Sequence, residues 1–121
     1  MIITETKPFG MIKNELGETK EIDILSCNAC AKMCETGGEK EMNEFENRMK
    51  EIKIDVKTKN LVETACDANQ IKNIEFKTNT IVVLACEAAS FNIRKYFPDK
   101  KIITTCDTIG VGAWDEQGNM T

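Results

Sequence analysis

The chain has 121 residues, of which 41% are hydrophobic and 30% are charged, a composition typical of one folded domain. Its formal net charge of −4 offers no basic surface to nucleic acid or to anionic lipid, so we expect neither as a partner. The sequence has no signal-peptide pattern and no apolar run of membrane-spanning length, and we therefore expect a cytoplasmic protein.

The first half of the chain predicts a helix, a strand and a second helix. Apolar residues at helical spacing between Pro8 and Gly17 predict a short helix, because proline suits a first turn and glycine suits a helix end. The mostly apolar run 21–26 predicts the first strand. Apolar residues at three- and four-residue steps then predict an amphipathic helix over roughly 38–53.

The second half predicts three more strands. The segment 54–60 is ambiguous between a strand and a connection, so we place the second strand at 61–65. The runs 81–85 and 101–105 are rich in β-branched residues and predict the third and fourth strands. Residues 88–97 between them predict a helix that ends at a proline.

Strands that alternate with helices predict an α/β fold with a parallel sheet. We therefore expect a small Rossmann-like or flavodoxin-like domain with about four parallel strands and flanking helices, over residues 1–113. Residues 114–121 are expected to form a short turn or tail, with Gly110 and Gly112 as turn residues.

The six cysteines are notable because the chain has no histidine. Thiols are kept reduced in the cytoplasm, so a disulfide framework is the weaker interpretation. Without imidazole, any metal must be held by sulfur or carboxylate ligands.

A cysteine directly follows each predicted strand, and these residues are Cys27, Cys66, Cys86 and Cys106. Because parallel strands point the same way, residues just past their carboxyl ends gather at one edge of the sheet, where open α/β folds bind ligands. Thiols that are far apart in sequence are therefore expected to meet. A cysteine at a strand end is also often a small buried residue, and that alternative stays open for Cys66 and Cys106.

The most specific motif is a C-x2-C-x3-C array made by Cys27, Cys30 and Cys34. Three thiolates within eight residues can hold one metal centre if the fold supplies a fourth ligand. We predict Cys86 as that ligand, because it ends the clearest strand, and Cys66 is the alternative.

A sulfur-only ligand set suits either zinc or an iron–sulfur cluster. Structural zinc usually serves domains too small to form a core, which favours a cluster here without excluding zinc. Gly37 and Gly38 follow the array, and glycines at a helix start expose N–H groups that can donate to cluster sulfurs. The alternative is that they form an ordinary loop before a helix.

Three stretches together resemble the amino-terminal part of the accessory subunit of anaerobic methylenetetrahydrofolate reductases. They are Cys27–Gly38, Val83–Cys86 and Asp107–Gly112. The resemblance extends over about residues 1–112. It implies a domain that supports a flavin-dependent catalytic subunit, which interconverts methylene- and methyltetrahydrofolate.

The resemblance further implies that iron–sulfur or zinc is bound by the three array cysteines and Cys86, with Cys66 also matching. Two features differ from the family. Longer members continue into a second cysteine-rich region that this chain lacks, and Cys106 stands where a residue that binds no metal is expected. A role in a path of several clusters is therefore not inferred.

Our leading hypothesis is an electron-transfer or scaffold module that carries one 4Fe–4S cluster and works with a larger redox or folate-enzyme subunit. The chain has no nucleophile–base pair and no G-x-G-x-x-G motif, so we do not expect catalysis by it alone. Two alternatives stay open: a structural zinc-binding interaction domain, and a thiol redox protein that uses Cys27 and Cys30 as a C-x-x-C pair.

Overall fold

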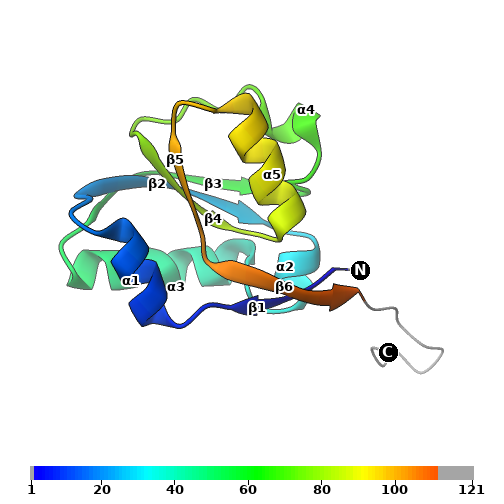
Figure 1. Cartoon of the computed structure of the whole chain (residues 1–121), viewed down its shortest axis with the longest axis horizontal. Helices are drawn as coiled ribbons and strands as arrows, with labels where there is room; N and C mark the ends of the chain where they lie inside the picture. Colours follow the sequence, from blue (N-terminus) through cyan, green and yellow to red (C-terminus); the bar gives the residue numbers. More distant parts are fainter. Residues whose placement is uncertain (1, 112–121) are drawn as a thin grey trace.

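The computed structural model describes residues 2–111, and its arrangement is α/β (Figure 1). In chain order the elements are β1 (Ile2–Thr6), α1 (Phe9–Leu16), β2 (Glu21–Cys27), α2 (Cys30–Met33), α3 (Gly38–Glu51), β3 (Asp55–Val62), α4 (Ala68–Ile71), β4 (Thr80–Leu84), α5 (Glu87–Tyr96), β5 (Lys101–Thr104) and β6 (Cys106–Val111). None of the helices within this range is long and apolar enough to cross a membrane. The predicted tail at 114–121 lies outside the described residues.

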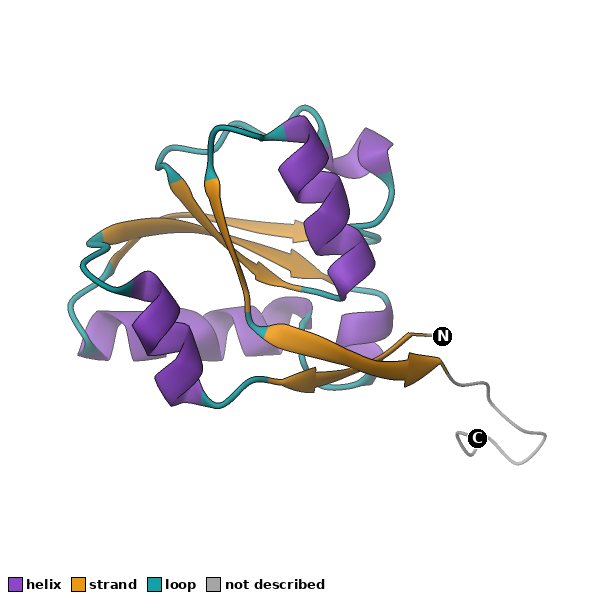
Figure 2. Cartoon of the chain, viewed as in Figure 1, coloured by secondary structure: helices purple, strands orange, loops and turns teal. Residues whose placement is uncertain are grey.

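The central sheet has four strands in the order β3-β2-β4-β5, and every neighbouring pair is parallel. This confirms the predicted fold class. Numbered by their order in this sheet alone, the strands run 2-1-3-4, which is the start of the flavodoxin-like order. Helices α1 and α3 cover one face of the sheet, and α4 and α5 cover the other (Figure 2).

Each face of the sheet has its own hydrophobic core. On the α1/α3 face, Leu16 and Met49 pack against β-strand residues such as Ile22 and Val82. On the α4/α5 face, a second cluster includes Leu25, Val83 and Ile93 together with two of the cysteines. Strands β2 and β4 face both cores, which explains why almost all of their residues are buried and most are apolar.

The predicted position of the second strand was wrong. The strand is β3, Asp55–Val62, and most of the predicted range 61–65 is the turn that follows it. β3 is an edge strand whose residues alternate between exposed and half-buried, so it lacks an apolar run. Its lysines made it resemble a connection, yet Lys57 and Lys59 stay at the surface, where charges protect a sheet edge from pairing with another chain.

A two-stranded antiparallel ribbon, β1 with β6, was not predicted. Gly110 was expected in a turn, but it lies in β6 as the register partner of Ile3. β5 and β6 are separated by Thr105 alone, so the chain leaves the sheet and directly enters the ribbon (Figure 1). The ribbon joins segments about a hundred residues apart, a pairing that local sequence patterns do not reveal.

A buried carboxylate anchors the amino-terminal part of the sheet. Asp23 in β2 is fully buried and accepts hydrogen bonds from the Thr58 hydroxyl and from the Thr78 N–H and hydroxyl at 2.5 to 2.9 Å. The Lys77 N–H also donates to it at 3.1 Å. Every lone-pair direction of the carboxylate is therefore used, and the loop before β4 is held against β2.

Candidate metal centre

The cysteine array begins at the topological switch point of the sheet. β2 and β4 lie side by side, whereas the chain runs from β2 outward to β3 on one side and from β4 outward to β5 on the other. In open α/β sheets, the loops at such a point diverge and leave the crevice where ligands bind. Here those two loops follow Cys27, the last residue of β2, and Leu84, the last residue of β4.

Cys27 and Cys86 lie in one buried side-chain cluster. Cys27 is the last residue of β2, and Cys86 is the residue before the first turn of α5. Their side chains are 5% and 6% exposed and belong to the same cluster on the α4/α5 face. Ala31, Ala65 and Ala89 belong to this cluster as well, together with larger residues such as Leu25 and Ile93.

The other two array cysteines lie on or beside a short helix. Cys30 is the first residue of α2, and Cys34 follows its end in a turn and is half-buried. The side chain of Cys30 lies outside the described part of the structure. Among the side chains that are described, no group of three or more cysteine or acidic residues is arranged to hold a metal ion. The full array with Cys30 therefore stays a prediction.

Gly37 is wedged between the ends of β2 and β4. A Cβ atom at this position would lie 2.6 Å from the Leu84 carbonyl oxygen, 2.7 Å from the Ala31 Cβ and 3.1 Å from the Cys27 carbonyl oxygen. Distances below about 3 Å are shorter than van der Waals contact, so only glycine fits here. The loop after the array therefore crosses directly over the switch point.

The amides of the two glycines have partners inside the protein. The Gly37 N–H donates to the Ala31 carbonyl at 3.0 Å, and the Gly38 N–H donates to Ser26 Oγ at 2.8 Å. Ser26 Oγ in turn donates to the Gly38 carbonyl at 3.0 Å, and Gly38 has a φ of +91°. Close packing and a left-handed backbone thus account for both glycines, and their predicted donation to cluster sulfurs is not what the structure shows.

Cys66 lies in the turn between β3 and α4 and is exposed. The preceding residue, Ala65, is fully buried, and its N–H donates to Cys27 Sγ at an N···S distance of 3.4 Å. The turn that carries Cys66 is thus in direct contact with the first array thiol. Sequence patterns could not reveal this contact, because it is made by a backbone amide.

Cys106 begins β6 and contacts the loop that carries the glycines. It is 1% exposed, and its Sγ is 3.4 Å from both the Thr36 carbonyl oxygen and the Thr105 hydroxyl. Burial raises the pKa of the Cys106 thiol above its ordinary value of 9.0. A buried neutral thiol with protein partners fits the alternative that Cys106 is a small core residue.

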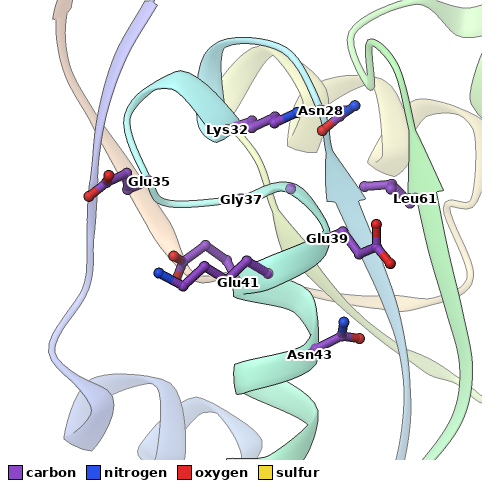
Figure 3. Close-up of a pocket in the computed structure, with 10 residues that line it drawn as sticks. Asn28, Lys32, Glu35, Gly37, Glu39, Glu41, Asn43 and Leu61 are labelled. Atoms are coloured by element: carbon purple, nitrogen blue, oxygen red, sulfur yellow. The ribbon is translucent and has the colours of Figure 1, made fainter.

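An open pocket of about 550 Å³ adjoins the array, and sequence analysis did not predict it. It is lined by the start of α3, the array loop and the end of β3, with Asn28, Lys32, Glu35, Glu39 and Leu61 around it (Figure 3). Its charged lining residues include both lysines, Lys32 and Lys40, and glutamates, Glu35, Glu39 and Glu41, so side chains of both charge signs line it.

No family model, curated protein or solved structure matches this chain.

Proposed function

We propose that this domain binds one 4Fe–4S cluster through Cys27, Cys30, Cys34 and Cys86 and serves as an electron-transfer or accessory module for a larger partner. The observation that carries the proposal is that Cys27 and Cys86 lie in one buried cluster at the switch point, where the buried Ala65 amide donates to the Cys27 sulfur. A bound cluster would supply one-electron transfer.

The donor chemistry fits such a group. Cys27 and Cys86 are unbridged thiols, and a sulfur-only set suits iron–sulfur clusters and zinc. Cys86 also precedes the first turn of α5, where the helix dipole stabilises a thiolate. The apolar cluster to which both cysteines belong supports a water-poor setting for the group.

The two separate cores favour a cluster over structural zinc. Structural zinc typically supplies the folding energy of domains that cannot fold without it. This domain packs apolar clusters on both faces of its sheet, so it has no such need. The burial of Cys27 likewise argues against a C-x-x-C redox enzyme, whose attacking thiol must be accessible.

The partner we propose is a flavin-dependent enzyme of the methylenetetrahydrofolate reductase type. Its support is the resemblance of the array with its Thr-Gly-Gly ending, of the Val83–Cys86 strand end and of the stretch after Cys106. The turn at Cys66 is exposed and contacts Cys27, so the proposed site lies close to the protein surface. Electron exchange with a partner requires such a position.

The test is the metal and sulfide content of protein prepared without oxygen. We expect brown protein with about four iron and four acid-labile sulfide atoms per chain. Cys86→Ala should lose the cluster, while the matched control Cys106→Ala should keep it. Colourless protein with about one zinc would support the zinc alternative instead.

Two outcomes would contradict the proposal. Retention of the cluster in Cys86→Ala together with its loss in Cys66→Ala would show that the fourth ligand is Cys66. Oxygen-free material without iron or zinc would refute metal binding altogether. The proposed partner is checked separately, by mixing reduced protein with a flavin-dependent methylenetetrahydrofolate reductase and following reduction of the flavin by its absorbance.

A further inference from the structure

The turn that connects β3 to α4 is unusually well fixed for an exposed connection. The Thr64 N–H donates to Gln70 Oε1 at 2.8 Å, and the Asp67 N–H donates to the Thr64 carbonyl at 3.1 Å. Asp67 also caps α4, accepting from the Asn69 N–H at 3.0 Å. Between these fixed points, the Ala65 N–H is directed at Cys27 Sγ.

If the proposed function holds, we infer that this turn, residues 63–67, forms part of the metal site. In it the Ala65 amide donates to the ligand sulfur of Cys27, and Asn92 is the positioning residue that holds the amide there. The turn would thereby set the reduction potential and the metal retention of the site.

Asn92 links the turn to the helix that follows Cys86. It lies on α5, and its Nδ2–H donates to the Cys66 carbonyl at 2.5 Å. A carbonyl only accepts, so the side-chain amide can have only this orientation. One side chain therefore fixes the carbonyl of Cys66, the residue after Ala65, relative to the helix whose amino-terminal end follows the proposed fourth ligand.

The chemistry of the Cys27 sulfur explains why the donor matters. As a neutral thiol, Cys27 accepts from the Ala65 N–H at 3.4 Å and donates weakly to the Glu63 carbonyl, with an S···O distance of 4.0 Å. Metal binding would release the thiol proton to solvent and leave a thiolate, which would accept the N–H in a stronger, charge-assisted bond. Reduction adds negative charge to the sulfurs, so this bond stabilises the reduced state and raises the potential.

The residue after Cys27, Asn28, also bonds the end of β3 and the turn. The Asn28 N–H, next to Cys27, donates to the Val62 carbonyl at 2.8 Å. Its side chain reaches Glu63 Oε1 at 3.5 Å. The first array cysteine is therefore enclosed between two segments that are hydrogen-bonded to each other, and a small displacement of either changes the N–H···S distance.

The test compares Asn92→Leu with Asn43→Leu, an exposed asparagine on α3 whose side chain bonds only Lys59 among the described contacts. Asn92→Leu should give a more negative midpoint potential and about 10-fold faster metal loss to a chelator, as expected for an outer-shell change. Asn43→Leu should match the wild type in midpoint potential and in the rate of metal loss. Asn92→Gln keeps the side-chain donor and should therefore lie closer to the wild type than Asn92→Leu in both quantities.

A second measurement needs no metal. In metal-free protein, hydrogen exchange of the Ala65 amide should be slow in the wild type and at least about 10-fold faster in Asn92→Leu, because the amide is held less firmly. If Asn92→Leu does not fold, Gln70→Met, which releases the Thr64 N–H at the other end of the turn, takes its place.

The outcomes separate the two proposals. Wild-type protein without metal would refute the proposed function, while the Ala65 exchange rate would still decide whether Asn92 holds the turn. Metal-loaded Asn92→Leu with wild-type potential, wild-type chelator kinetics and an unchanged Ala65 exchange rate would overturn the inference and leave the proposed function standing.

Discussion

Replacing Gly37 by alanine tests whether the loop after the array is as tightly packed as the structure shows. The added methyl would lie 2.6 Å from one backbone oxygen and 2.7 Å from the Ala31 Cβ. Neither neighbour is the end of a flexible side chain, because the first is the Leu84 carbonyl at the end of a central strand. Relief therefore requires movement of backbone, which is costly.

We expect Gly37→Ala to lower the free energy of unfolding by about 3 kcal/mol, the upper end of the usual cost of overpacking. That is a large part of the roughly 5–15 kcal/mol that stabilises a typical domain. It corresponds to a fall in Tm of on the order of 10 °C for a chain of this size. Urea unfolding followed by circular dichroism measures the first quantity, and thermal unfolding measures the second.

Gly10→Ala is the matched control. Gly10 lies within α1, and a Cβ there would have no atom within 4 Å. Alanine also favours helix over glycine, so this variant should be more stable by about 0.5–1 kcal/mol. A Gly37→Ala protein as stable as the wild type, with Gly10→Ala behaving as expected, would refute the argument that the loop is wedged between β2 and β4.

Three further predictions follow from described contacts. Asp23→Asn places an NH2 group among donors and should destabilise the fold by about 3 kcal/mol in urea unfolding, whereas the exposed Asp55→Asn should cost less than about 1 kcal/mol. Ser26→Ala removes the hydroxyl that bonds both backbone groups of Gly38, and we expect a loss of about 2 kcal/mol by the same assay. Burial raises the pKa of Cys106, so as pH rises the unfolded chain releases this proton before the folded one does. The free energy of unfolding should therefore fall as pH rises above about 9, and Cys106→Ala should flatten that part of the pH profile. An identical slope in both proteins would contradict the raised pKa of Cys106.

The strands that face both cores could be predicted from the sequence. The runs that became β2 and β4 are mostly apolar because helices cover both sides of them. The cysteines that follow these runs, Cys27 and Cys86, belong to one buried cluster, and their shared binding of a metal stays a prediction. β3 was misplaced, because an edge strand with charges such as Lys57 gives no such signal.

The features that depend on tertiary contacts could not be predicted. The sequence indicated that Gly37 and Gly38 follow the array, but whether their amides face a ligand or the protein depends on how the loop crosses the strand ends. The contact between the Ala65 N–H and Cys27 Sγ joins residues 38 positions apart through a backbone group, which carries no signature in the side-chain pattern. The same holds for the ribbon, in which Thr6 pairs with Cys106.

Because the ribbon pairs β1 with β6, the two ends of the described chain lie side by side. Ile2 and Val111 are register partners, so the first and last strands are neighbours in the fold. A short linker could join these strands, and new termini could be opened at the exposed residue Asn73, between α4 and β4. Such a circularly permuted chain would retain every strand pairing, since only the connectivity changes.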